Sequence, residues 1–182
     1  MVRTEFDKLI AEIKQCKKCE QVDKKGKVIC RGSLPCDLLI IGEAPGKSEV
    51  VQGKPFVGRA GTFLQIVLDK VKKELELDVK ILMTNAMFCR PITKGLDNRT
   101  PSRIELFNCQ YYVNRLIQLA KPKVILCLGN VSKGIYYKNN DRYFTTYHPA
   151  YLIRRGSFSS PEYPSFTRTL IRAIIKANGG EL

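Results

Sequence analysis

The chain contains no run of 18 apolar residues, the length that a membrane-spanning helix requires. Its start, MVRTEFDKLIAEIKQC, is a charged amphipathic pattern without the apolar stretch of a secretory signal. No internal repeat and no linker-like segment divides the 182 residues, which are enough for a sizeable core. These absences predict one domain over residues 1–182 in an intracellular, cytoplasmic protein without membrane contact.

Acidic residues are few. The chain has 17 Asp and Glu against 31 Lys and Arg, which gives a net charge of +14. Such an excess of positive charge favours a polyanionic partner, and nucleic acid is the first candidate. A generally basic protein without such a partner is the alternative.

The seven cysteines are an odd number, and a high one for a reducing compartment. This count argues against a full disulfide framework. It favours metal ligation, or simple burial of some of the thiols.

Apolar periodicity predicts strands that alternate with helices. Helices are expected over 4–15, from Thr62, from Thr100, over 131–137 and over 165–177, with strands over 37–41, 79–84, 124–128 and 143–147. This order predicts an α/β fold, in which a mostly parallel sheet is covered on both faces. Residues 155–164 are expected to form an irregular surface loop.

Two of the predicted helices carry start signals. Thr62 and Gln65 fit a capping box, and Thr100 followed by Pro101 fits an N-cap with proline in the first turn. The face of the second of these helices that is expected to point inward consists of Ile104, Phe107, Tyr111, Leu116 and Ala120.

Polar residues follow three of the predicted strands. The stretch LLIIGEAPG places Glu43 after the first strand, Asn85 follows the second, and His148, the single histidine, follows the fourth. The carboxyl ends of parallel strands share one edge, which is where open α/β sheets bind ligands. Phe56 lies in the glycine-rich loop that follows Glu43. We therefore expect these four side chains to meet in one site.

These residue types suit work on a nucleobase. An Asn amide both donates and accepts hydrogen bonds, an aromatic ring stacks on a base, and a His stabilises a developing anion. A carboxylate orients water or stabilises a cationic sugar. Each residue alone also fits a purely structural role. Together they predict an enzyme that takes a base out of the stack and acts on its glycosidic bond.

Five motifs in order, GEAPG, GKPFVGRAG, TNAMFCRP with NRTP, LCLGN and HPAYLIRR, resemble the family 4 uracil-DNA glycosylases, the iron–sulfur members of the uracil-DNA glycosylase superfamily. The resemblance runs from Cys16 to about Arg155. It implies a three-layer α/β/α sandwich around a parallel four-stranded sheet. It also implies hydrolysis of the bond between uracil and deoxyribose in DNA, which leaves an abasic site.

The resemblance also implies residue roles. Phe56 would stack on the flipped uracil, Asn85 would pair with its edge and reject cytosine, and His148 would stabilise the departing uracil anion. Glu43, between Gly42 and Ala44, would position the attacking water, and Glu49 matches a second acidic position. Tyr151, Leu152 and Arg154 match the segment that enters the minor groove. Phosphate contacts are expected among the basic residues near the sheet edge, namely Lys47, Lys54, Arg59, Arg90, Lys94, Arg99, Arg154 and Arg155.

The cysteines have two interpretations. In the resembled family a [4Fe–4S] cluster is held by four cysteines, which map onto Cys16, Cys19, Cys89 and Cys109. A local zinc site made by Cys16, Cys19, Cys30 and Cys36 is the rival. Cys127 lies within a predicted strand and is expected to be a small buried hydrophobe.

Three functions follow from these patterns. The first is a monomeric uracil-DNA glycosylase that acts on single- or double-stranded DNA. The second is a non-catalytic binder of uracil-containing or abasic DNA. The third is a zinc-dependent nucleic-acid adaptor.

Overall fold

A computed structural model describes residues 2–181 of the chain. The elements in chain order are α1 (Val2–Gln15), β1 (Cys30–Gly32), β2 (Leu38–Gly42), α2 (Lys47–Gln52), α3 (Arg59–Leu75), β3 (Ile81–Asn85), α4 (Arg103–Ala120), β4 (Val124–Leu128), α5 (Gly129–Tyr136), β5 (Tyr143–Thr146), α6 (Pro149–Arg154), the 3-10 turn η1 (Ser157–Ser159) and α7 (Tyr163–Ala177). No helix in this range is long and apolar enough to cross a membrane.

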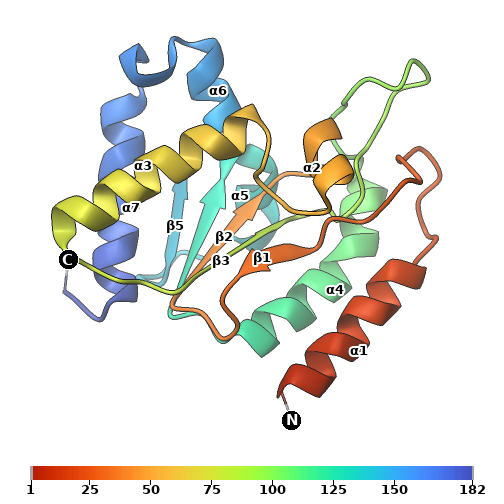
Figure 1. The fold of residues 1–182 in the computed structure, drawn as a ribbon, viewed down its shortest axis with the longest axis horizontal. Helices are drawn as coiled ribbons and strands as arrows, with labels where there is room; N and C mark the ends of the chain where they lie inside the picture. Colours follow the sequence, from red (N-terminus) through yellow and green to blue (C-terminus); the bar gives the residue numbers. More distant parts are fainter. Residues whose placement is uncertain (1, 182) are drawn as a thin grey trace.

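One sheet with the strand order β1-β3-β2-β4-β5 forms the middle of the molecule (Figure 1). The pairs β2·β3, β2·β4 and β4·β5 are parallel, as predicted, and β1 adds an antiparallel edge strand beside β3. The α/β class and the mostly parallel sheet are confirmed. The expected number of four strands was one too low, because β1 has only three residues and no apolar alternation.

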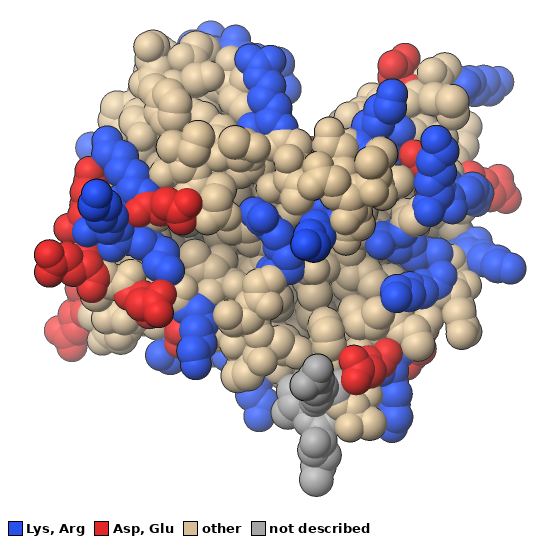
Figure 2. Space-filling model, viewed as in Figure 1, with Lys and Arg blue, Asp and Glu red and all other residues tan. Residues whose placement is uncertain are grey.

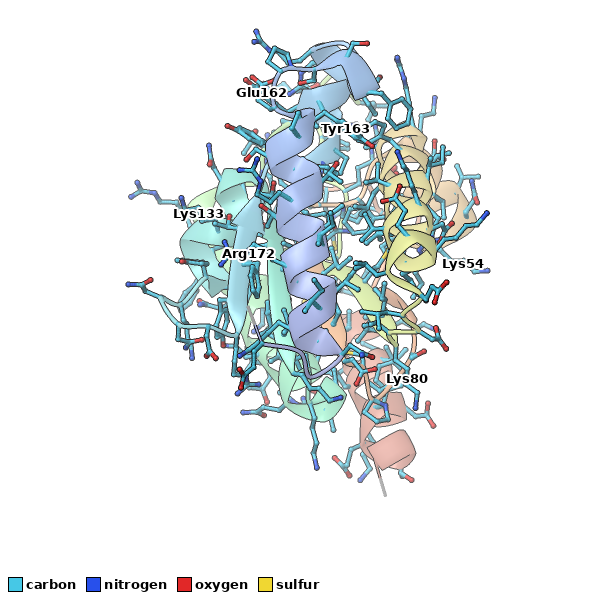
Figure 3. The ribbon with its side chains drawn as sticks, turned by 90° about the vertical axis from the view of Figure 1, so that its left-hand side faces the viewer. Lys54, Lys80, Lys133, Glu162, Tyr163 and Arg172 are labelled. Carbon is cyan, nitrogen blue, oxygen red and sulfur yellow. The ribbon has the colours of Figure 1, made fainter. Side chains whose placement is uncertain are left out.

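Helices cover both faces of the sheet. Alternate residues of β2 point to opposite sides because side chains alternate along a strand. Leu38 and Ile40 pack in the core beneath α3, α6 and α7, whereas Leu39 and Ile41 pack in the core beneath α1, α4 and α5. In Figure 3, α7 lies in front between β5 and α3. The predicted three-layer arrangement is therefore present.

Two predicted helix starts were wrong. α3 begins at Arg59 after the N-cap Gly58, and the Thr62 hydroxyl donates back to the Gly58 carbonyl oxygen at 3.2 Å. α4 begins at Arg103. Its N-cap is Ser102, which forms a capping box with Glu105.

The predicted inward face of α4 was also wrong in its first half. Leu116 and Ala120 are buried, but the buried positions before them are Glu105, Cys109 and Val113. The three predicted core residues Ile104, Phe107 and Tyr111 are exposed. The segment 155–164 is more regular than predicted, since it contains η1 and the start of α7.

Candidate active site

The carboxyl ends of β2, β3 and β5 open onto one cavity of about 600 Å³. Figure 2 shows a hollow at this upper end of the molecule, between the α3–α6 side and the α2 side. The predicted meeting of Glu43, Asn85 and His148 with Phe56 is confirmed, because all four line this cavity. Other predicted residues that line it are Ala44, Lys47, Glu49, Arg59, Arg99 and Arg154. Pro91, Asn98 and Thr100 were missed by sequence reasoning.

Phe56 and Asn85 converge on the backbone of Gly42. A Cβ on Gly42 would lie 2.5 Å from the Asn85 Oδ1 and 2.6 Å from the Phe56 Cζ. Phe56 itself has a φ of 56°, a strained conformation for a residue with a bulky side chain. A Cβ on Gly61 would lie 2.0 Å from the Phe56 carbonyl carbon. Gly42 and Gly61 thus permit the placement of the aromatic ring, which explains part of the glycine content of this loop.

Glu49 organises the loop through its carboxylate. The Glu49 Oε1 accepts hydrogen bonds from the backbone N–H groups of Val57 at 3.1 Å and Gly58 at 2.7 Å, and the Oε2 accepts one from Gly46 at 3.2 Å. A carboxylate held by several backbone donors is a strong, charge-assisted anchor. These contacts fix the two ends of the loop that carries Phe56, so they support a positioning role for Glu49.

His148 is held in one orientation by the start of α6. The imidazole caps this helix, because its Nδ1 accepts a hydrogen bond from the Ala150 N–H at 3.2 Å. An accepting Nδ1 carries no proton, so the proton of the neutral ring lies on Nε2. Burial and the Arg154 charge lower the pKa of His148 to about 4, against a smaller opposite effect of Glu49. The ring is therefore neutral at pH 7, with Nε2–H as its free donor.

Glu43 makes no side-chain hydrogen bond among the described residues, so its carboxylate is free to bind water. Its backbone carbonyl accepts from the Met87 N–H at 3.2 Å, which ties it to the segment after β3. Burial raises the pKa of Glu43, and the charge of Arg154 opposes that effect. Arg154 thus favours the ionised carboxylate and, at the same time, the neutral imidazole of His148.

One wall of the cavity is formed by the segment between β3 and α4. Arg99 holds this wall: its Nη atoms donate to both carboxylate oxygens of Glu105 at 2.6 and 2.8 Å, and its Nη2 also donates to the Gln21 carbonyl at 2.9 Å. The guanidinium is thereby occupied, although the residue lines the cavity. The prediction that Arg99 contacts phosphate is therefore corrected.

Arg90 lies behind the same wall and not at the surface. It is buried, and its guanidinium donates to Asp23 at 3.2 Å, to Asn98 at 2.6 Å and to the Leu96 carbonyl at 2.7 Å. The prediction that Arg90 contacts DNA is corrected accordingly. Its burial makes it a support for the cavity wall.

The segment after His148 forms α6 and differs in part from the prediction. Leu152 is completely buried in the core, so it does not enter a DNA groove in this arrangement. The Tyr151 ring is stacked on Tyr147 at 5.4 Å between centroids, and its hydroxyl bonds to Glu162 at 3.2 Å. Tyr147, the residue before His148, is 42% exposed, and Arg154 and Arg155 at the end of α6 are exposed as well.

A second cavity of about 690 Å³ lies beside the first and shares Glu43, His148 and Arg154 with it. Its other lining residues include Tyr151 and Gly129-Asn130 of the LCLGN motif. Gly129 has a φ of 82°, and a Cβ there would lie 3.0 Å from the Cβ of His148. The motif therefore allows the close approach of the two strand ends that frame the imidazole.

The cysteines fall into two electrostatic groups. Burial raises the pKa of Cys89 to about 11 and that of Cys109 to about 12, and nearby charge on Cys16 and Cys19 adds to the shift of both. In the described part of the chain, Cys36 is the one cysteine whose pKa is raised by Cys30, and burial is again the larger cause. Cys127 is buried, as predicted. The four cysteines predicted as cluster ligands are thus neighbours, and the rival set is split between the two groups.

Hydrogen bonds support this neighbourhood. The Asn108 amide donates to the Cys19 Sγ at 3.7 Å and to the Lys18 carbonyl at 3.3 Å. The Asp23 N–H donates to the Arg90 carbonyl at 2.9 Å. Within residues 2–181, no group of three or more Cys, His, Asp or Glu side chains is arranged to hold a metal ion. The four thiols have the donor chemistry of an iron–sulfur cluster, but among the described residues they are not gathered into a closed set of ligands.

Comparisons with known proteins agree with this site. The model of the uracil DNA glycosylase superfamily matches residues 31–171. The type-4 uracil-DNA glycosylase of Archaeoglobus fulgidus is 33% identical over 142 residues, which are 78% of this chain and 68% of the relative.

Two further relatives bear the same name. The protein of Pyrobaculum aerophilum is 33% identical over 185 residues, 85% of this chain and 89% of the relative. That of Saccharolobus solfataricus is 35% identical over 134 residues, 73% of this chain, but the match spans only 59% of the relative. From the superfamily match and these identities, the chain belongs to the uracil DNA glycosylase superfamily and, within it, to the type-4 uracil-DNA glycosylases.

Proposed function

We propose that this protein is a uracil-DNA glycosylase, which hydrolyses the N-glycosidic bond of a flipped deoxyuridine and leaves an abasic site. The observation that carries the proposal is the cavity in which Glu43, Asn85 and His148 meet beside Phe56. Membership of the type-4 family supports the same reaction. The protein acts as a monomer on single- or double-stranded DNA, inside the cell, and the chain works as one domain.

The base is recognised at the Phe56–Asn85 side of the cavity. The ring of Phe56 provides a stacking platform, and the Asn85 amide pairs with the uracil edge. Cytosine presents an amino donor where uracil has the O4 acceptor. A buried amide left unpaired in this way discriminates strongly between the two bases.

The reaction itself needs a water nucleophile and a stable leaving group. The Glu43 carboxylate orients the water and accepts its proton as the water oxygen bonds to the sugar C1′. The C1′–N1 bond breaks, and the electron pair stays on uracil, which departs as an anion. The His148 Nε2–H donates a hydrogen bond to that anion, because the Nδ1 is already engaged by Ala150.

The test is release of free uracil from an oligonucleotide with one uracil, followed by alkaline cleavage of the abasic site. We expect cleavage by the wild type and by Lys80→Ala, and a loss of at least tenfold for Asn85→Ala and for His148→Ala. If the wild type binds the DNA but releases no uracil, the protein is instead a non-catalytic binder of uracil-containing DNA.

We further propose that Cys16, Cys19, Cys89 and Cys109 hold a [4Fe–4S] cluster. Burial is the main cause of the raised pKa of Cys89 and Cys109, and the further effect of Cys16 and Cys19 on both supports this proposal, because such an effect requires the four thiols to lie near one another. Such a cluster would supply a structural cross-link between the segment after α1, the loop after β3, and α4. Four thiolates are its usual ligands.

Metal content decides between the cluster and the zinc site. We expect about four irons per chain in the wild type and in Cys30→Ser, and loss of iron in Cys89→Ser. Zinc without iron, together with loss of metal in Cys30→Ser, would support the nucleic-acid adaptor instead.

A further inference from the structure

Three large apolar side chains form an exposed face on α4. Ile104, Phe107 and Tyr111 are 73%, 75% and 58% exposed. Their spacing of three and four residues places them on one side of the helix. Single exposed apolar residues are common, but a contiguous group of them marks an interaction site. We call these three residues, one aliphatic and two aromatic, the aromatic face of α4.

Positive charges border the aromatic face. The Arg115 guanidinium lies 5.5 Å from the Tyr111 ring centroid, and the Lys18 ammonium lies 5.7 Å from that of Tyr112. Arg103, in the first turn of α4, is exposed. The carboxylates nearby are engaged, since Glu12 pairs with Arg115 and Glu105 with Arg99. Aromatic rings interleaved with cations are the pattern of a surface for single-stranded nucleic acid.

α4, which carries the aromatic face, begins three residues after Thr100, at the rim of the active-site cavity. Arg99 and Thr100 line the cavity, and Arg99 is bonded to Glu105, the neighbour of Ile104. From there α4 runs away from the cavity towards the opposite end of the molecule (Figure 1). The stretch from Ile104 to Tyr111 spans ~10 Å along the helix. A strand that leaves the cavity on this side therefore meets the aromatic face next.

A second copy of the chain is a poorer occupant. A symmetric interface would bring the Arg103 and Lys18 side chains of two molecules towards each other, each molecule with a net charge of +14. Three side chains also cover much less than the ~800 Å² per partner of a stable interface. An anionic strand satisfies both the charges and the rings.

We propose that the aromatic face of α4 binds the single-stranded DNA beside the flipped nucleotide. Bases stack on Phe107 and Tyr111, and Arg103 and Lys18 contact phosphates. The proposal rests on the proposed function only in that a nucleotide bound in the cavity places the strand at this rim.

The test is the affinity for a uracil-free single-stranded oligonucleotide, measured by fluorescence anisotropy. We expect Phe107→Ala and Tyr111→Ala each to weaken binding by about tenfold or more, and Phe107→Tyr to bind like the wild type. Ile66→Ala is the control, because Ile66 is 51% exposed on α3, outside this surface. Thermal unfolding of all variants should match the wild type, since the side chains are exposed.

Wild-type affinity in both alanine variants would overturn the proposal. So would a drop in molecular mass by light scattering in Phe107→Ala with unchanged DNA affinity, which would make the face a contact between copies. Uracil release is measured separately. If the wild type releases no uracil but the alanine variants still bind the strand more weakly, the aromatic face remains a DNA-binding surface. Only the glycosylase activity is then rejected.

Discussion

At the scale of single residues, His148 does two things with one ring. Its Nδ1 caps α6, so its Nε2–H is left for a ligand. A flipped ring would lose the cap, so the helix start selects both the orientation and the tautomer. The chain has no other histidine, which makes this group directly observable in solution.

The protonation of His148 gives the first prediction at this scale. Its pKa is lowered from 6.5 to about 4 by burial and by Arg154, so its NMR signals should titrate far below pH 6. Protonation of His148 should therefore not slow uracil release between pH 7 and pH 6. Arg154→Gln should move the midpoint upward. A midpoint at or above 6.5 in the wild type would contradict the assigned tautomer role.

The lowered pKa of His148 also makes the stability of the fold depend on pH. The unfolded chain binds a proton at His148 below about pH 6.5, whereas the folded chain does so only near pH 4. This residue therefore lowers stability as the pH falls through that window and has no effect above it.

Residue positions differed in how far the sequence could predict them. Glu43, Asn85 and His148 follow strands, and parallel topology brings strand ends together, so their meeting was predictable. Arg90 and Leu152 were misassigned, because a basic or apolar side chain beside a motif does not reveal whether it points outward or into the core.

At the scale of elements, two arginines connect the cavity wall to a segment that is far away in sequence. Arg99 links the cavity wall, α4 and the segment after α1, and Arg90 links the same wall to Asp23. These contacts make the wall a rigid part of the site although it contains no regular helix or strand.

Arg99→Ala should destabilise the fold by on the order of 3 kcal/mol, because Glu105 would keep a largely buried carboxylate without its partner. The measurement is the free energy of unfolding in denaturant. Lys72→Ala is the control, since its partner Asp78 is 97% exposed and the pair contributes little. Equal losses of unfolding free energy in the two variants would show that the Arg99 contacts stabilise the fold no more than an exposed ion pair does.

The orientation of α4 was the largest error in reading elements from sequence. Its buried face begins with Glu105, a carboxylate that is stabilised inside by Arg99 and by the backbone N–H of Ser102. Periodicity treats Glu105 as a surface residue and selects the apolar Ile104, Phe107 and Tyr111 instead. Arg99 and Glu105 are only six residues apart, and Ser102 and Glu105 have the spacing of a capping box, so a local signal was present that apolar periodicity does not contain.

At the scale of the whole molecule, positive charge is unevenly distributed. Figure 2 shows basic residues on both sides of the hollow and below it, whereas the visible acidic residues lie away from the hollow, towards the left and right edges. Lys47 and Arg59 begin α2 and α3 and line the cavity. Lys80 lies at the end of the molecule opposite η1 and the start of α7 (Figure 3).

Affinity for DNA should therefore fall linearly in a plot of log K against log salt concentration. Lys47→Ala and Arg59→Ala should each reduce the slope by about 1, as expected for one lost phosphate contact. Lys80→Ala should leave both the affinity and the slope unchanged. A similar effect of all three substitutions would mean that overall charge, and not this surface, attracts the DNA.

The cavity draws its residues from chain segments between Glu43 and Arg154, and its imidazole comes from the end of β5, the last strand, which pairs with β4. A chain interrupted before that point, during synthesis or by a protease, has the base-stacking ring but lacks the imidazole. The capacity to remove a base from the genome is then gained in a single late step of synthesis.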